Sequence, residues 1–398
     1  MPFRILSLDG GGIRGVISAT MLAAIEKQID QPLNQYFDLI AGTSTGSILA
    51  AGIAAGLSSK EIIGIYKEKG SEIFPYTSRF SLKRIPLLMK YGLSAPKFSD
   101  EGLAKVLSDT LGDTKLLDIK DPLLLIVAYD TITREPIVFK SWREEACYGN
   151  IPLWEACVCS SSAPTFFPAH KLDKRINGVA QCADENTITL CEQVSSSNNI
   201  YNNTHIRITS GTGKGQTRTI KNYEGTKRRA FIDSPWENIP DHTSSYSIKT
   251  IYSAIDGGIA ANNPSSCAVA EALKLGHKVE DISVLSLGTG DLTRIIPFEK
   301  AQGWGLVQWA QPLISMLLDA SSIVHGYITN QIIDDRVLRL QFKLDQELTG
   351  KRLSDDIDDA SQENINNLIE AAEVYIQQPK MQAALRQFLG SDQEIITR

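Results

Sequence analysis

The stretch that most constrains this chain is Gly42-Thr43-Ser44-Thr45-Gly46 together with its flanks. Residues 36–41 form an apolar run short enough for a buried strand, and an Ala/Ile/Leu-rich helical pattern follows. Ser44 therefore falls at a strand-to-helix corner, which is the setting of a nucleophile elbow, and Gly42 and Gly46 leave room for neighbouring elements to approach. The pattern predicts Ser44 as a nucleophile, with an ordinary strand–turn–helix corner as the alternative.

A glycine-rich turn lies earlier in the chain. It joins a predicted strand over residues 3–8 to a predicted helix over 16–25, and its sequence is Asp9-Gly10-Gly11-Gly12-Ile13-Arg14-Gly15. Unpaired N–H groups at the start of a helix attract anions, so a phosphate cradle, an oxyanion hole and a tight turn are all possible. The endings typical of Walker and dinucleotide loops are absent. Because the elbow follows the next strand and would face this turn, an oxyanion hole is favoured. Arg14 either adds charge there or caps the turn and reaches solvent.

Composition and charge narrow the class of protein. The 398 residues are 42% apolar, enough for a sizeable core, and 40 basic against 46 acidic side chains argue against nucleic-acid binding through phosphate contacts. The first apolar segment is too short for a signal peptide, and no run approaches the ~18 apolar residues of a membrane span. We therefore expect a soluble, cytoplasmic protein that meets membranes peripherally. The six cysteines lack zinc-site spacing, so we expect no metal and buried thiols.

Strands and helices alternate along most of the chain, which predicts an α/β fold with a largely parallel sheet covered on both faces. The helix over 56–73 begins with the capping-type sequence Ser58-Ser59-Lys60-Glu61. Other helices are predicted at 99–112, from Leu153 onward, at 361–376 and at 379–389, and other strands at 123–129, 250–255, 284–287 and 337–344.

Two segments depart from this alternation. Residues 74–91 mix basic and bulky apolar side chains with prolines, a composition suited to a mobile flap that touches lipid, or to a loop packed on the core. Residues 173–250 are rich in Thr, Ser, Asn and Gly and predict a small β-rich insertion. Within it, residues 211–215 join two strand-like runs and open no helix, so a hairpin turn is favoured over a phosphate loop.

Candidates for a proton-accepting partner of Ser44 come later in the chain. Asp256 ends a predicted strand and is followed by Gly257 and Gly258, so it is either a turn residue or a base. His170 would be the partner in a Ser-His-Asp enzyme, or else a surface histidine.

Four motifs taken together resemble the patatin-like phospholipase family in identity and order. They are the turn at residues 9–15, the elbow at 42–46, the sequence Ser162-Ala163-Pro164-Thr165-Phe166-Phe167-Pro168, and Asp256-Gly257-Gly258 with Asn262-Asn263-Pro264. The resemblance covers nearly the whole chain apart from about residues 173–250. It implies a three-layer α/β/α sandwich formed by residues 1–172 and 251–398, with 173–250 as an insertion.

The resemblance also implies an activity and the residues that perform it. The family hydrolyses acyl esters of phospholipids and related glycerolipids at membrane or micelle surfaces, without a metal or cofactor. Ser44 would be the nucleophile and Asp256 its partner in a dyad, which requires a dry pocket that raises the pKa of the carboxyl group. Gly10, Gly11 and Gly12 would form the oxyanion hole, with Arg14, Gly42, Gly46, Gly257 and Gly258 in support.

Two departures and two alternatives accompany this prediction. The family usually has a second glycine after the elbow where this chain has Ser47, and the insertion precedes the Asp256 loop, where it could shield the site, bind an unknown partner or add affinity for a surface. A Ser-His-Asp esterase would need His170, His277 or His325 at the site. A lipid- or partner-binding protein would keep the fold without turnover.

Overall fold

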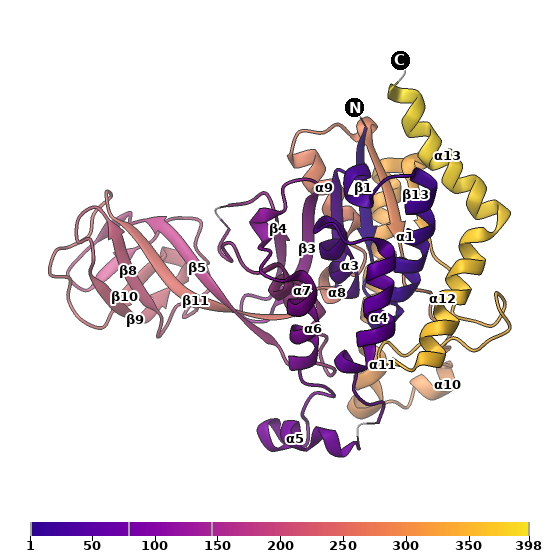
Figure 1. The fold of residues 1–398 in the computed structure, drawn as a ribbon. Coiled ribbons are helices and arrows are strands. Elements are labelled where there is room, and N and C mark those ends of the chain that lie inside the picture. Colours follow the sequence, from indigo (N-terminus) through magenta and orange to yellow (C-terminus); the bar gives the residue numbers. More distant parts are fainter. Residues whose placement is uncertain (1, 79, 145, 397–398) are drawn as a thin grey trace.

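The computed structural model describes residues 2–78, 80–144 and 146–396, which are built around a central β-sheet (Figure 1). Five neighbouring strands of this sheet are parallel. In spatial order they are β13 (Val337–Leu340), β12 (Ile282–Leu287), β1 (Phe3–Leu8), β2 (Leu39–Thr43) and β3 (Leu123–Asp130). The strands β4 (Glu135–Lys140) and β11 (Ser245–Asp256) both pair with β3 in the antiparallel direction.

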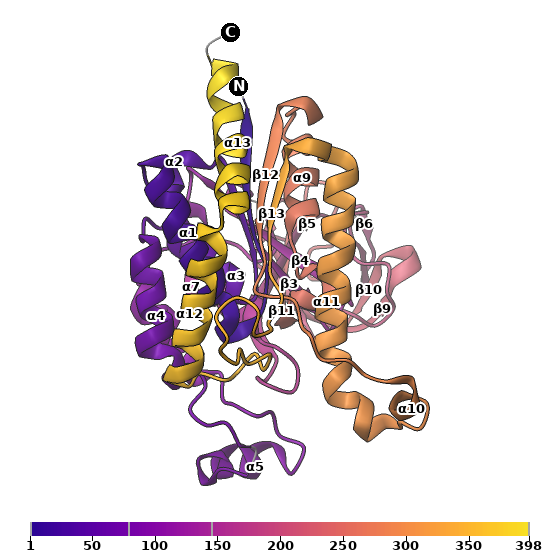
Figure 2. The same ribbon diagram turned by 90° about the vertical axis from the view of Figure 1, so that its right-hand side faces the viewer.

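Helices cover both faces of the sheet, which Figure 2 shows nearly edge-on. One face carries α1 (Gly15–Ile29), α3 (Thr45–Ala54), α4 (Ser59–Ile73), α7 (Leu153–Ser161) and α12 (Gln362–Gln377), and the other carries α9 (Ser265–Lys274) and α11 (Leu306–Ile333). The remaining helices are α2 (Leu33–Tyr36), α5 (Ile85–Tyr91), α6 (Glu101–Leu111), α8 (Gly258–Ala261), α10 (Phe298–Ala301) and α13 (Pro379–Ile396).

The two cores follow from the alternation of side chains along each strand. Ile5, Leu39 and Leu125 belong to the cluster that α9 completes, whereas their neighbours Leu6 and Ile40 belong to the larger cluster on the other face. Strands buried on both faces must be apolar throughout, which is why they appear in the sequence as continuous runs. The prediction of an α/β fold with helices on both faces of a mostly parallel central sheet is confirmed.

Some elements differ from the prediction in extent. The capping box of α4 is present, since the Ser58 side chain accepts from the Glu61 N–H and the Glu61 carboxylate accepts from the Ser58 N–H. In contrast, β11 begins five residues earlier than predicted, at Ser245, and β13 ends at Leu340. The helix α11, with 28 residues from Leu306 to Ile333, was not predicted from the sequence.

The segment after α4 carries a short helix and an exposed tip. It contains a 3₁₀ turn at Leu82–Arg84 and then α5, with Pro86 in the first turn of the helix, where proline is tolerated. Phe80, Leu82 and Met89 are almost fully exposed, whereas Phe74 and Tyr76 pack on the core, so the alternative of a packed loop holds for only part of the segment.

The predicted insertion is β-rich and projects from the body of the molecule on two long antiparallel strands (Figure 1). These strands are β5 (His170–Val179) and β11, which pair from His170 with Ala254 to Val179 with Ser245. A separate apolar cluster fills the projecting part. The turn between β8 and β9 is the predicted hairpin. The other strands are β6 (Cys182–Ala183), β7 (Thr187–Thr189), β8 (His205–Ser210), β9 (Thr217–Glu224) and β10 (Arg229–Ile232).

The expectation of buried thiols holds for part of the cysteines. All six are free, Cys157 and Cys159 are buried, and Cys182 lies exposed on the insertion. Within residues 2–78, 80–144 and 146–396, no group of three or more His, Cys, Asp or Glu side chains is placed to hold a metal ion. Across the same residues, every helix is too short or too polar to span a bilayer.

Candidate active site

Ser44 occupies the sharp turn between β2 and α3 that the sequence predicts. Its backbone has φ 54° and ψ −126°, a conformation that costs energy for any residue other than glycine. The Ser44 N–H donates to Ser160 Oγ at 2.8 Å, and both the N–H and the hydroxyl of Ser47 donate to the Ser44 carbonyl, at 2.9 and 2.6 Å. Ser47 therefore supplies a bond that a glycine in its place would lack, and this bond helps to hold the strained turn.

The glycines on either side of Ser44 are required by close packing. A Cβ on Gly46 would lie 2.1 Å from the Leu8 carbonyl oxygen of β1, and a Cβ on Gly42 would lie 2.2 Å from the Gly46 oxygen. Both contacts involve backbone atoms that cannot move aside cheaply. The spacing of the motif is thus explained by the approach of α3 to the sheet.

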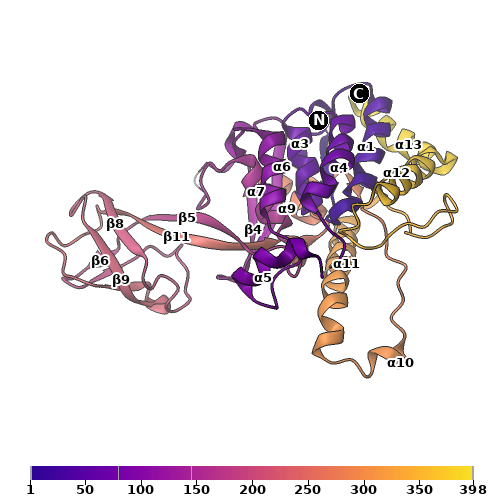
Figure 3. The same ribbon diagram turned by 60° about the horizontal axis from the view of Figure 1, so that its bottom comes forward.

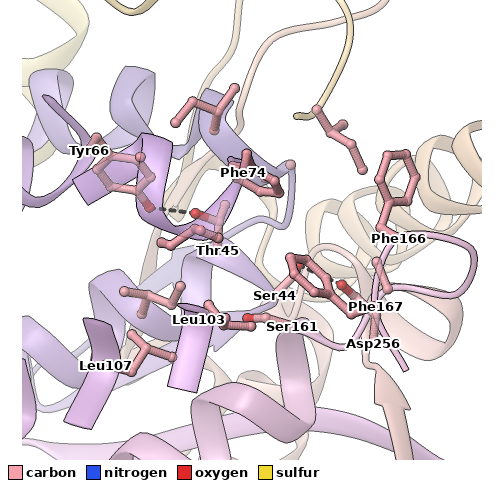
Figure 4. Close-up of a pocket in the computed structure, with 18 of the residues that line it drawn as sticks. Ser44, Thr45, Tyr66, Phe74, Leu103, Leu107, Ser161, Phe166, Phe167 and Asp256 are labelled. Atoms are coloured by element: carbon pink, nitrogen blue, oxygen red, sulfur yellow. Dashed lines mark hydrogen bonds between the residues drawn. The ribbon is translucent and has the colours of Figure 1, made fainter. Parts of the chain in front are cut away.

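Strand register brings Ser44 and Asp256 together. β2 pairs with β3 up to Thr43 opposite Val127, and β11 approaches from the other direction and ends with Asp256 opposite Ala128. The two strand ends therefore abut along the same side of β3. The Ser44 hydroxyl donates to Asp256 Oδ2 at 2.6 Å, and Figure 4 shows both side chains at one end of a pocket.

Burial raises the pKa of Asp256 from its ordinary value near 3.8 to about 6, although the hydrogen bonds from Ser44 and from the Gly258 N–H lower it. The Gly258 bond to Asp256 Oδ1 is 2.7 Å long. A Cβ on Gly257 would lie 2.0 Å from the Val127 carbonyl oxygen, so only glycine fits between Asp256 and β3. The carboxyl group thus sits in the dry setting that a base for a serine requires.

The first glycine turn lies directly against the elbow. A Cβ built on Gly10 would stand 3.0 Å from Ser44 Cβ. The Gly10 N–H already donates to the Asn262 carbonyl at 3.1 Å, so it is unavailable to an oxyanion. The N–H groups of Gly11 and Gly12 have no hydrogen-bond partner among the described residues, and Gly12 has φ 61°, which favours glycine.

Arg14 is buried, so the alternative in which it reaches solvent is wrong. Its Nε donates to the Gly11 carbonyl at 3.3 Å and holds the turn. Burial lowers the pKa of Arg14, against the opposing effect of nearby carboxylates such as Asp319. The residue supports the glycine turn from behind.

An apolar pocket extends from Ser44 and Asp256 between the helices. In Figure 4, Leu103 and Leu107 of α6 lie on one side of it, and Phe166 and Phe167 lie beside the two polar residues. The hydroxyl groups of Thr45 and Tyr66 bond to each other. The rest of the lining comprises Gly11, Gly12, Ile13, Ile48, Ile65, Gly70, Ile73, Phe74, Ser161, Ala163, Leu318 and Ile357.

The three histidines considered as partners are engaged elsewhere. Burial by itself would lower the pKa of His170, but its bonds to Asp100 and Glu155 raise it to about 9. His277 stacks on Phe3, and His325 bonds to Ser266 and to the Ala260 carbonyl. Within the described part of the chain, Ser44 has no histidine as a hydrogen-bond partner.

The end of α7 braces the site in a way that sequence reasoning missed. Ser160 Oγ accepts from the Ser44 N–H and donates to the Val127 carbonyl at 2.5 Å. The Asp256 N–H donates to the Ser162 carbonyl at 3.0 Å. The run Ser160-Ser161-Ser162 could have drawn attention, because three adjacent serines at the end of a buried helix need partners.

A strained serine bonded to a buried carboxylate at the mouth of an apolar pocket is an arrangement of the serine-hydrolase type. Residues 6–184 match the family model described as patatin-like phospholipase. The chain is 27% identical over 412 aligned positions to Patatin-like protein 2 of Oryza sativa subsp. indica, with 94% of this chain and 83% of that protein covered. It is 24% identical over 393 positions to Patatin of Solanum tuberosum, with 94% and 84% covered. The chain is therefore similar to patatin-like phospholipases, through the family model over residues 6–184 and through these relatives over most of its length.

Among solved structures, human GIVD cytosolic phospholipase A2 aligns with a TM-score of 0.40 and 13% identity, covering 98% of this chain and 63% of that one.

Proposed function

We propose that this protein is a lipid acyl hydrolase that cleaves fatty-acyl esters of phospholipids or other glycerolipids through Ser44 and Asp256. The observation that carries the proposal is the 2.6 Å hydrogen bond from the serine hydroxyl to a buried carboxylate, made at one end of an apolar pocket. The similarity to patatin-like phospholipases supports the same class of substrate. Analysis of the products from mixed glycerolipids would distinguish phospholipase A from lysophospholipase activity.

The reaction follows from the protonation state of the pair. Asp256 accepts the Ser44 proton while Ser44 Oγ attacks the acyl carbonyl carbon, which forms a tetrahedral intermediate. The carbonyl double bond re-forms, the alcohol leaves with the proton from Asp256, and an acyl-enzyme remains. Water then gives its proton to Asp256 and attacks the acyl carbon, and Ser44 recovers its proton as the fatty acid is released.

The negative oxygen of the intermediate would be bound by the N–H groups of Gly11 and Gly12. Their lack of partners among the described residues supports this role, and a donor of this kind contributes about 3–4 kcal/mol in a known hydrolase. Gly10 contributes close packing against Ser44 and no donor, because its N–H is bound to Asn262.

The pocket beyond Ser44 would hold the acyl chain. Its lining is almost entirely aliphatic and aromatic, so burial of methylene groups would supply the binding energy, about 0.8 kcal/mol for each one. A lipid substrate would be drawn from a membrane or micelle by a cytoplasmic protein that binds the surface peripherally. The insertion at 173–250 would then be free to bind a partner.

Replacement of the two residues tests the proposal. We expect Ser44→Ala and Asp256→Asn each to lower kcat/KM for a p-nitrophenyl ester and for phospholipid at least about 10³-fold, because the nucleophile or its base is lost. Ser71→Ala and Asp113→Asn, which change exposed residues of the same types, serve as matched controls. Mass spectrometry of the products from mixed glycerolipids gives the acyl position. Equal, negligible turnover by all five proteins would favour lipid binding without catalysis.

A further inference from the structure

Two groups of apolar side chains project into solvent at the same end of the molecule. The α5 tip consists of Phe80, Leu82, Met89 and Leu93, which are 81% to 97% exposed, and the α10 tip consists of Ile295 and Phe298, which are 84% and 74% exposed. Figures 1 and 2 both show α5 and α10 at the end opposite the two termini, and Figure 3 brings this end forward. Side chains this large are rarely left uncovered in groups unless they bind something.

The α5 tip is held outward by its own anchors. Arg84 is buried and donates to the carbonyls of Ala95 and Pro96, which closes the base of the loop. Leu87 is the buried residue of α5, and it fixes the opposite side of the helix. Arg84 and Leu87 thus fix the inner side of α5 against the body, so the exposed side chains on its outer side are held in solvent by the fold.

The segments that carry the two tips both lie next to the candidate active site. The Phe98 N–H donates to the Phe166 carbonyl and the Lys97 N–H to the Thr165 carbonyl, so the α5 segment returns to the chain that lines the pocket. On the other side, a cleft runs from Gly10 and Gly11 to Ile295 and Pro297 beside α10. The mouth of the site thus lies between two apolar projections.

The charge of the α5 segment differs from that of the whole chain. Between Tyr76 and Lys97 the sequence has Arg79, Lys83, Arg84, Lys90 and Lys97 and no acidic residue, although the chain carries a net charge of −6. Lys83 and Lys90 are exposed beside the apolar tip. Apolar side chains flanked by lysines favour the boundary between anionic headgroups and acyl chains.

We propose that the α5 and α10 tips together form a docking surface that inserts into anionic phospholipid membranes and places the mouth of the pocket against the lipid. This inference rests on the proposed function for its choice of partner, and it adds where the membrane binds and which headgroup charge it prefers. Insertion on two sides of the mouth would let a lipid pass into the pocket without crossing water.

Vesicle sedimentation tests the apolar part of the surface. All variants are made on Ser44→Ala so that no lipid is consumed, and the vesicles are phosphatidylcholine alone or phosphatidylcholine mixed with phosphatidylserine. We expect the double variant Leu82→Gln/Met89→Gln and the single variant Phe298→Gln each to lower the partition coefficient about tenfold. Leu275→Gln is the matched control, because Leu275 is an exposed leucine just after α9, before the strand β12 begins at the opposite end of the sheet. Its partition coefficient should equal that of the parent.

The charged part of the surface is tested in the same assay. We expect Lys83→Gln/Lys90→Gln to remove most of the preference for phosphatidylserine vesicles and to leave binding to phosphatidylcholine unchanged. Lys278→Gln, at the end that carries Leu275, should keep the full preference. Added salt should weaken the preference of the parent and of Lys278→Gln but not the binding of the lysine double variant.

Hydrolysis of a soluble p-nitrophenyl ester, measured with Ser44 intact, separates this inference from the proposed function. The tip variants should hydrolyse the ester at the parental rate, since none of the changed residues lines the pocket. Parental vesicle binding by the tip variants would overturn the docking surface even if ester hydrolysis is strong. If light scattering shows the parent to be a dimer and the tip variants to be monomers, the membrane-docking proposal would also be overturned, because the tips would then bind a second copy of the chain. Absent ester hydrolysis with the expected vesicle results would overturn the proposed function and leave the docking surface supported.

Discussion

Asp256 is a carboxyl group under two opposing influences. Burial favours its neutral form, whereas the hydrogen bonds from Ser44 and Gly258 favour the charged form, and the balance leaves the pKa at about 6. A base is most useful when its pKa lies just below the working pH, because it is then ionised and still basic. The position of Asp256 at the end of β11, paired with β3 and bonded to Ser44, produces that balance.

The pH dependence of ester hydrolysis should report this group. In the proposed mechanism Asp256 must be ionised to accept the Ser44 proton, so activity should be present above pH 6 and should be lost as the pH falls through that value. We expect kcat/KM for a soluble ester to fall about tenfold per pH unit below pH 6, the slope of a single protonation. Steady-state kinetics between pH 4 and pH 8 measures it.

His170→Gln is the control for this profile, because histidine ordinarily titrates in the same range. In this fold the pKa of His170 is raised to about 9 by Asp100 and Glu155, after burial has opposed the shift. The variant should keep the limb near pH 6. If the fall in activity below pH 6 disappears in His170→Gln, the titration belongs to the histidine, which would argue against Asp256 as the base.

At the scale of single elements, a buried ion pair joins two segments that enclose the site. Lys97, at the end of the α5 segment, contacts Asp358, in the loop before α12, and their side chains are 11% and 9% exposed. The same loop contributes the Ile357 carbonyl, which accepts from the Ile13 N–H beside the glycine turn. The pair therefore ties the outer segments to the turn that faces Ser44.

Breaking this pair should destabilise the fold. We expect Lys97→Met to lower the free energy of unfolding by about 3–5 kcal/mol, because Asp358 would be left charged or protonated in a buried place without a partner. The double variant Lys97→Met/Asp358→Leu should recover most of the loss. Denaturant unfolding measures all three proteins.

The exposed pair between Lys69 and Glu72 provides the comparison. Lys69→Met should leave the unfolding free energy unchanged within error, since exposed pairs are hydrated and contribute little. Equal losses in Lys97→Met and in the double variant would show that the pair itself contributes nothing and that Lys97 acts through its packing.

The elements that the sequence predicted well are those with a local cause. The buried strands are continuous apolar runs, and α4 carries its own capping box. α11 was missed because Pro312 lies in its second turn and because its apolar residues, such as Leu313 and Leu317, occupy exposed positions as well as buried ones. Its pattern thus lacks the single apolar face that marks a helix.

The candidate site, too, could be predicted from the sequence only where a local pattern marks it. The elbow and the glycine turn are local patterns, and the sequence placed both at strand ends. The contact between Ser44 and Asp256 depends on the register of β2 and β11 against β3, which no local pattern encodes. The run of three serines marks a place that needs partners, but the bond of Ser160 to Ser44 comes from the tertiary packing of α7, so that partner is seen only in the folded chain.

At the scale of the whole molecule, the insertion has its own apolar cluster and joins the body through β5 and β11 alone among the strands of the sheet. Asp173 pairs with Ile251 near the base of this stalk. All buried residues of the separate cluster lie between these two positions, and Cys147 of the body packs against it from outside. Removal of the cluster would therefore take no buried residue from the main core.

We expect a chain in which an Asn-Gly turn replaces residues 174–250 to fold and to hydrolyse a soluble ester at the parental rate. The two strands already run antiparallel at the cut, and Asn-Gly suits a two-residue hairpin. Circular dichroism, thermal unfolding and ester turnover measure the outcome. A truncated chain that fails to fold would mean that the insertion is part of the main folding unit.

The paired ends of the stalk have one more consequence. Because they lie side by side, the body offers a graft point at which a foreign module with adjacent termini, such as a fluorescent reporter or a sugar-binding unit, could be exchanged for the native one. In such a chimera the end of β11 would still place Asp256 beside Ser44. The same body could then be directed to different binding targets by exchange of the module.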